Sequence, residues 1–349
     1  MDELTKLSLA LIENCINIKG LSSLIGNDYS AIINALVEKK VKEELDNVND
    51  EGIKALKALV DGNSDFQKHA SGENIARRFD VDPLKVDTIY HYTDISVLKK
   101  LIDSQQFYMG SVHHMNDPLE IKYTYDISRK ILEEMGASNC EKTAFNQDTQ
   151  STIFDSYIWS FSANKNNQAL NNYGEIAIGI DVQKLQNHLS NRNTNLYFEN
   201  MHEGNGYTFP LYVEYDEEIQ NEYLRSVLKE WLLAYRGLKN TPLEQVASDI
   251  AFECIQALFL FSLCFKRHLL YQEEEIRFVV ERISMSKEQK PDTYFNNRPV
   301  IITDFTPDMV SSIVVSHKNG ADKRIEEIKQ YLFEHGFGQT KVLLTDMPY

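Results

Sequence analysis

The chain has 349 residues, of which 42% are hydrophobic and 25% charged, and its formal net charge is −16. This length exceeds the usual domain of about 100 to 200 residues, so we expect one large domain with an appendage, or two domains. The composition excludes a disordered or fibrous chain. The negative charge argues against a dedicated nucleic-acid binder, which needs basic residues to neutralise phosphates.

Residues 1–84 are predicted to form a helical region. Apolar residues recur at helical spacing in "YSAIINALVEKKVKEELDNV", and "EGIKALKALV" continues the pattern. The first 20 residues are acidic where a signal peptide would be basic, which indicates an amphipathic helix. "GENIARRFDVDP" has a superficial likeness to a DNA-recognition helix, but its acidic surroundings favour a packing or partner-docking helix. We expect this region to regulate the protein or to bind a protein partner.

From residue 85 the pattern changes to short β-branched and aromatic runs between helices, which predicts an α+β domain over residues 85–349. "TIYHY" is a predicted strand, and Thr93 is the predicted N-cap of the helix that follows it. In "MNDPLEIKYTYDI", Asp117 is predicted to cap a second helix and Glu120 to complete a capping box.

Three further strands are predicted at "SYIWSFS", "EIAIGID" and "FPLYVEY", and a helical insertion follows over about residues 217–265. Its apolar run "AFECIQALFLFSLCF" is shorter than the roughly 20 residues that span a bilayer, so we expect a buried helix and no membrane contact. The 4 cysteines form no CxxC pair, which predicts buried free thiols in the cytoplasm. After another strand, "EEEIRFVVE", the C-terminus is predicted to form strand, helix and strand, with Gly336 just past the helix end.

Three of these strands are predicted to carry one apolar and one polar face, because alternate side chains of a strand point to opposite sides. The aromatic residues of "SYIWSFS" form an apolar face, and so do Ile276 and Phe278 of "EEEIRFVVE". An exposed sheet face or a salt-bridge ladder would explain such alternation without a function. The polar residue types, however, are ones that bind or activate substrates. The predicted polar faces consist of His91 and Thr93, of Ser160 and Ser162, and of Glu273, Glu275 and Arg277.

The order of these motifs resembles the three-part signature of the ADP-ribosyltransferase superfamily: a histidine within "YHYT", then "SFS", then "EEE". The resemblance covers about residues 87–282 and implies a split mixed or antiparallel sheet around a cleft that binds NAD. The chain departs from the commoner pattern of the superfamily in two respects. It has Ser-Phe-Ser where Ser-Thr-Ser is usual, and about 110 residues separate this motif from the glutamates.

The resemblance also implies roles for the matching residues. His91, with Tyr92 and Thr93 beside it, would hold the adenine-side ribose or the nicotinamide carboxamide of NAD. Ser160 and Ser162 would brace the nicotinamide ribose and the strand that carries the glutamates.

The two glutamates would carry the chemistry. Glu275 would stabilise the oxocarbenium-like charge that develops as nicotinamide leaves, and Glu273 would orient or deprotonate the acceptor. The implied function is an NAD-consuming enzyme that transfers ADP-ribose to a protein or nucleic acid, or hydrolyses NAD, as a bacterial toxin or antiphage effector would.

A closer resemblance links "YHYTDISVLKKLIDSQQFYMGSVHHMNDPLE", "WSFSANKNNQALNNYGEIAIGID", "FKRHLLYQEEEIRF" and "VLLTDMPY" to an uncharacterised bacterial domain family. The pattern of this family adds Asn116 and Arg277 to the candidate NAD-binding residues. It also picks out Asp117 and Glu120, for which helix capping is the preferred explanation.

Two other functions remain open. A non-catalytic nucleotide-binding sensor would use "SHKNGADKR", which joins a strand to a helix N-terminus, although no GxGxxG or Walker-type sequence supports it. A metal-dependent hydrolase would use His113, His114 and Asp117, but adjacent histidines rarely point the same way on a strand. No metal is expected. Ser-His-Asp hydrolysis lacks a GxSxG motif.

Overall fold

The computed structural model describes residues 45, 47–70, 72–115, 119–151, 156–192, 207–281, 291–317 and 320–347. The protein is a mixed α and β protein, and its chain divides into two compact units. Each unit is assembled from separate stretches of the sequence. The first comprises Met1–Ile75, Tyr125–Ile153 and Glu218–Leu260, and the second comprises Ala76–Thr124, Phe154–Glu217 and Phe261–Tyr349. The helices predicted within residues 1–44 lie outside the described residues.

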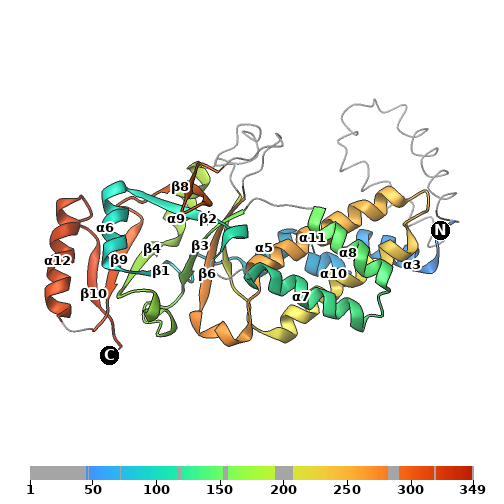
Figure 1. The fold of residues 1–349 in the computed structure, drawn as a ribbon, viewed down its shortest axis with the longest axis horizontal. Helices are drawn as coiled ribbons and strands as arrows, with labels where there is room; N and C mark the ends of the chain where they lie inside the picture. Colours follow the sequence, from blue (N-terminus) through green and yellow to red (C-terminus); the bar gives the residue numbers. More distant parts are fainter. Residues whose placement is uncertain are drawn as a thin grey trace. The chain divides into compact units, whose positions relative to one another are not determined.

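The first unit is helical, with no strand among its described residues (Figure 1). Two of its helices approach closely at Gly52 and Gly237, where a Cβ on Gly237 would lie 1.9 Å from the Gly52 nitrogen. Only glycine fits such a backbone contact. The helices that lie wholly or largely in this unit are α3 (Asp50–Val60), α4 (Asp65–Ala70), α7 (Leu119–Glu134), α8 (Asn139–Ser151), α10 (Glu217–Gly237) and α11 (Glu244–Cys264). Helix α5 (Gly72–Phe79) is divided between the units.

Helix α11 contains the apolar run that was predicted to be a buried helix. By length and composition it is the one helix among the described residues that could cross a bilayer, yet 56% of its most apolar window is buried within the protein. Burial of this kind is expected of a core helix. Its Cys254 and Cys264 are buried and free, as predicted, whereas Cys140 is exposed.

The second unit is built on a ten-stranded sheet, as far as its described residues show. The main path of the sheet runs β10-β9-β4-β1-β3-β2-β8-β7, and β6 and β5 branch from β3. Every pair is antiparallel except β9 with β10. The strands are β1 (Thr88–Thr93), β2 (Gln106–Ser111), β3 (Ser156–Ser162), β4 (Ile176–Asp181), β5 (Tyr207–Tyr212), β6 (Glu275–Glu281), β7 (Thr293–Phe295), β8 (Arg298–Asp304), β9 (Val310–Val315) and β10 (Lys341–Leu344).

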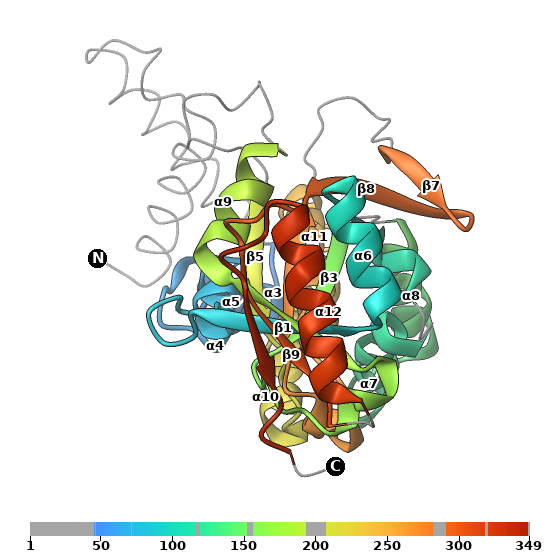
Figure 2. The same ribbon diagram turned by 90° about the vertical axis from the view of Figure 1, so that its left-hand side faces the viewer.

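One face of this sheet carries the hydrophobic core of the unit. Helices α6 (Ile95–Ser104), α9 (Val182–Arg192) and α12 (Ala321–Glu334) pack on it, and Figure 2 shows α6 and α12 in front of the strands. Each fully buried aliphatic side chain contributes about 1.5–3 kcal/mol. The core includes Ile89, Leu98, Trp159, Phe161, Ile178, Leu185, Phe278, Ile313, Ile328 and Leu332.

Two local predictions were wrong. Thr93 is the last residue of β1 rather than a helix cap, and Asp94 is the N-cap of α6, with no side-chain cap hydrogen bond. Glu273 and Glu274 do not belong to β6, because Glu273 ends a 3-10 helix, η5 (His268–Glu273), and Glu274 has φ 46°. The predicted strand-helix-strand at the C-terminus is confirmed, with Gly336 at φ +85° after α12.

Candidate functional site

The second unit contains a cavity of about 1160 Å³ where the sheet splits. One edge of β3 pairs with β6 along its whole length, from Ser156 to Ser162. The other edge is shared by two strands: β2 pairs near Ile158, and β1 pairs only at Ser162. Ser160 therefore lies in the gap between β1 and β2.

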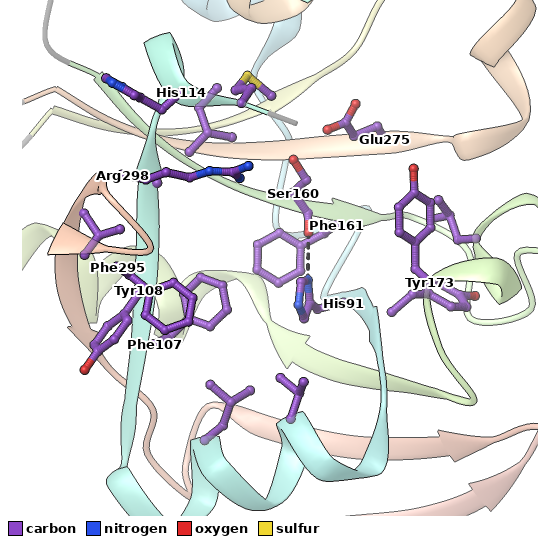
Figure 3. A pocket seen from close by; sticks show the side chains of 18 of the residues that line it. His91, Phe107, Tyr108, His114, Ser160, Phe161, Tyr173, Glu275, Phe295 and Arg298 are labelled. Carbon is purple, nitrogen blue, oxygen red and sulfur yellow. Dashed lines mark hydrogen bonds between the residues drawn. The ribbon is translucent and has the colours of Figure 1, made fainter. Parts of the chain in front are cut away.

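The cavity is lined by residues from both faces of the sheet, which is expected where neighbouring strands separate. Phe107 and Phe161 reach it from the core side together with α6, whereas Ser160 and Glu275 reach it from the opposite, polar side. Figure 3 shows these side chains around the opening. Its volume slightly exceeds the range of about 300–1000 Å³ that is usual for ligand pockets, and is large enough for a dinucleotide.

The register of the strands confirms the predicted polar face of β3 and, for Glu275 and Arg277, that of β6. Residues directly opposite each other in a sheet project to the same side. Ser160 lies opposite Arg277, and Ser162 lies opposite Glu275. Their partners on the core side, Trp159 and Phe278, are likewise opposite each other.

The predicted face of β1 was wrong. Tyr90 lies opposite Ser162, so Tyr90 and Tyr92 belong to the polar face. His91 lies opposite Ile178, a core residue, so His91 and Thr93 point to the core side. Alternation fixes only which residues share a face, and the tyrosines, with an apolar ring and a polar hydroxyl, suit either one.

His91 nevertheless lines the cavity, beside Ser160. Its Nδ1 lies 3.1 Å from the Ser160 carbonyl oxygen, as the dashed line in Figure 3 shows. The rings of Phe107, Trp159 and Phe161 surround it edge-on, with centroids 5.6–6.0 Å away. Burial lowers the pKa of His91, so the imidazole is neutral at neutral pH.

Three further residues of the first two motifs, Tyr90, Tyr92 and Phe161, also line the cavity. The hydroxyl of Tyr92 donates to the Asn164 carbonyl and accepts from the Asn167 amide. Burial raises the pKa of Tyr92 to about 12, so this hydroxyl keeps its proton. Ser162 and Thr93 are buried and lie outside the lining. Asn116 lies outside the described residues.

Asn167 connects the "SFS" strand to the segment before β6. Its side-chain amide donates to Ser162 Oγ at 3.1 Å and to the backbone carbonyls of Gln272 and Glu273 at 2.8 and 2.9 Å. Ser162 therefore positions the glutamate-bearing segment through Asn167. Asn167 is buried, and the sequence did not reveal that it connects these two segments.

A close backbone contact fixes the other side of the opening. Gly174 follows the 3-10 helix η3 (Ala169–Tyr173), and a Cβ there would lie 2.1 Å from the carbonyl carbon and oxygen of Thr93. A side chain at this position would push η3 away from β1. Leu170 and Tyr173 of η3 line the cavity, and Tyr173 is 62% exposed at its rim.

The polar side of the cavity holds a buried network of three carboxylates and two cations. Arg277 is fully buried, and its Nε and Nη2 donate to the two oxygens of Glu275 at 3.0 and 2.9 Å. Arg277 also pairs with Glu120 and donates to the backbone carbonyl of Leu263 at 3.0 Å. Lys266 lies 2.5 Å from Glu273, 2.9 Å from Glu275 and 3.3 Å from Glu120. Three negative and two positive groups leave one surplus negative charge.

This network holds Glu275 in its ionised form. Burial alone would raise the pKa of Glu275, but Arg277 and Lys266 outweigh it and lower that pKa to about 2. The same carboxylates raise the pKa of Arg277 and of Lys266, against the opposing effect of burial. The Tyr215 hydroxyl accepts the Glu275 backbone N–H, and burial raises its pKa, as does the nearby Glu275. Glu275 is suited to stabilise a cation and unsuited to accept a proton at neutral pH.

Sequence reasoning missed two members of the network. Glu120, for which a cap was preferred, pairs with Arg277, and its predicted capping partner Asp117 lies outside the described residues. Lys266 carried a usable signal: it follows the apolar helix α11, which ends at Cys264, and it lies a few residues before three consecutive glutamates.

The opposite wall is aromatic and basic. Tyr108 and Phe295 form an edge-on pair at 5.7 Å, and Arg298 of β8 projects toward the opening in Figure 3. Lys100 and Arg267 also line the cavity. These side chains can contact phosphates and a base, which fits a nucleotide.

The residues of the other two hypotheses lie differently. In the segment "SHKNGADKR", which the sensor hypothesis uses, Arg324 pairs with Glu175 at 3.0 Å and lies outside the lining of the cavity. His114 lines the cavity and His113 does not. Among the described residues no group of three or more His, Cys, Asp or Glu side chains is placed to hold a metal ion.

Comparisons with known proteins add no relative. No family model matches the chain, and searches of curated proteins and of solved structures found no match.

Proposed function

We propose that this protein consumes NAD in the split-sheet cavity, as an ADP-ribosyltransferase-like enzyme that transfers ADP-ribose to a macromolecule or to water. The observation that carries the proposal is the meeting of His91, Ser160 and Glu275 around one cavity of dinucleotide size. These residues come from three motifs that are separated by about 69 and 115 residues in the chain. A scattered arrangement of the three would have removed the basis for the proposal.

The surplus negative charge of the network supports this chemistry. A buried charge without a partner is costly, and a cationic ligand group would compensate it. NAD brings a pyridinium. When the bond from its nitrogen to the ribose breaks, the electron pair leaves with neutral nicotinamide and positive charge develops on the ribose. Glu275, which stays ionised, would stabilise that charge.

The acceptor then adds to the ribose and loses a proton. Glu273 is the candidate to orient the acceptor, because it lies at the same cavity and is less tightly held than Glu275: it contacts Lys266 but not Arg277. Water as acceptor gives NAD hydrolysis, and a nucleophile of a protein or nucleic acid gives ADP-ribosyl transfer.

A second candidate, a non-catalytic nucleotide sensor, is favoured by one observation. Both oxygens of Glu275 are occupied by Arg277. If ligand binding does not release one of them, the cavity binds a nucleotide without cleaving it.

The two candidates are distinguished by nicotinamide release. Purified protein is incubated with NAD and a cell extract that supplies acceptors and partners, and free nicotinamide is measured. Wild type should release nicotinamide, and Glu275→Gln should abolish release. Glu141→Gln is the matched control, because Glu141 is an arginine-paired carboxylate in the helical unit. A folded wild type that binds NAD without releasing nicotinamide would establish the sensor.

A further inference from the structure

Two close neighbours of His91 Nδ1 require different protonation states of this nitrogen. The indole Nε1–H of Trp159 donates to it at 3.2 Å, and the Ser160 carbonyl oxygen lies 3.1 Å away. An imidazole nitrogen is either a protonated donor or a lone-pair acceptor. It can accept from Trp159 or donate to Ser160, but it cannot do both.

The hydrogen bond from Trp159 is the more costly of the two to lose. An indole N–H can only donate, and Trp159 is 2% exposed, so losing its acceptor would leave a buried donor unsatisfied. The Ser160 residue lines the cavity, where water or a ligand can satisfy its carbonyl. We infer that Trp159 fixes His91 in the neutral tautomer that carries its proton on Nε2.

The surroundings of the ring agree with this assignment. Three aromatic rings, of Phe107, Trp159 and Phe161, enclose the imidazole edge-on, and this apolar environment disfavours a charged ring. A doubly protonated ring would direct an Nδ1–H at the Trp159 N–H. The direct contact with Trp159 therefore excludes the charged form as well as the other tautomer.

With this tautomer, His91 offers the cavity a hydrogen-bond donor, its Nε2–H. Among the described residues the hydrogen bonds of the His91 ring involve Nδ1 alone, and His91 lines the cavity, so with this tautomer the Nε2–H is left for a ligand there. Such a donor selects an acceptor oxygen, as in a ribose hydroxyl or a carboxamide carbonyl, over an amino group. Trp159 is then a positioning residue, which acts on the ligand through His91. This deepens the proposed function and rests on it only for the identity of the ligand.

The tautomer can be read directly by NMR. Protein with 15N-labelled histidine is recorded without ligand, and the resonances of His91 are assigned by their loss in His91→Gln. The unprotonated ring nitrogen resonates far downfield of the protonated one. We expect Nδ1 to be unprotonated and Nε2 protonated. A proton on Nδ1 in the wild type overturns the inference.

Two matched substitutions then assign the cause. Trp159→Phe removes the indole N–H and should allow His91 to donate from Nδ1 to Ser160, so the tautomer should change. Trp231→Phe is the control, because Trp231 is equally buried but donates to Asp148 in the other unit. A folded Trp159→Phe whose His91 keeps its proton on Nε2 would refute the role of Trp159.

Binding gives a second readout. With NAD as the probe in calorimetry, Trp159→Phe should bind about 5- to 10-fold more weakly, which corresponds to one lost neutral hydrogen bond. Trp231→Phe should bind as the wild type does. Affinity that is unchanged by Trp159→Phe despite a changed tautomer would overturn the contact between His91 and the ligand. Absence of NAD cleavage with the expected tautomer would refute the enzyme and leave the tautomer assignment intact.

Discussion

The two units each contain an arginine paired with carboxylates, and the surroundings of the pairs differ. In the helical unit, Arg236 contacts Glu141 at 2.5 Å and Glu51 at 3.7 Å. In the cavity unit, Arg277 and Lys266 share three glutamates. Each network has one carboxylate more than it has cations. Glu51 is 39% exposed, so water screens the surplus charge in the helical unit.

Water screens the charge of the cavity network far less. None of its five side chains is more than 16% exposed. Its surplus charge has no counter-ion among these five groups, and a cationic group that enters the cavity would compensate it. The comparison teaches that the number of ion pairs does not separate a structural network from a functional one, whereas the location of the uncompensated charge does.

The largest expected effect on stability comes from removing each arginine in turn. Arg277→Met should lower the free energy of unfolding by about 3–5 kcal/mol, because it leaves the three carboxylates of the buried network with Lys266 as their one cation within it. Arg236→Met should cost about 1 kcal/mol, because the side chain of Arg236 is 31% exposed. Urea unfolding measures both. Equal losses would contradict the distinction between the two networks.

A smaller effect on stability is expected from a buried carboxyl in the helical unit. Its contribution to stability depends on pH in the opposite sense to that of Glu275. Glu230 of the helical unit is 2% exposed, and its Oε1 lacks a hydrogen-bond partner among the described residues. Burial raises the pKa of Glu230 to about 8. The native carboxyl then stays protonated while the unfolded one ionises above about 4.5. Its contribution to stability is complete below pH 4.5 and is lost as pH rises toward 8.

Glu230→Gln removes this titration. Between pH 5 and 8 the wild type should lose on the order of 2–4 kcal/mol that the variant keeps. Glu275 should behave in the opposite way, since its pKa is lowered to about 2, and its contribution is lost as pH falls from about 4.5 toward 2. Urea unfolding at a series of pH values checks both. A wild type and a Glu230→Gln variant with parallel profiles would show that Glu230 ionises normally.

The smallest change in stability is expected from Glu120→Gln. This substitution leaves two carboxylates and two cations, and the amide can still accept a hydrogen bond from Arg277. The free energy of unfolding should change by less than about 1 kcal/mol. NAD affinity, measured by calorimetry, should fall several-fold, because the surplus charge is gone. Full affinity in this variant would show that the surplus charge is irrelevant to the ligand.

Much of the sheet was predictable because its strands follow the two-residue period. The faces of β3 and β6 followed from alternation once Trp159 and Phe278 were taken as core residues. The face of β1 did not, since tyrosine and histidine suit either side, and only pairing with β3 and β4 decides. Strands β2, β7 and β8 were not predicted.

The candidate site was predictable to a similar extent. The three motifs converge on one cavity, but the network that surrounds Glu275 depends on contacts that sequence spacing does not reveal. Glu120 is 157 residues from Arg277 in the chain. Asn167 bonds carbonyls about 105 residues away, and backbone acceptors carry no signal in the sequence. Such contacts are fixed by tertiary packing.

The contact between Gly174 and Thr93 has a consequence for the rim of the cavity. The space between Gly174 and the Thr93 carbonyl leaves no room for a side chain, so η3 and the end of β1 pack backbone against backbone. Tyr173 at the rim is therefore coupled to the strand that carries His91. A side chain in place of Gly174 would therefore alter the rim of the cavity and the strand of His91 together.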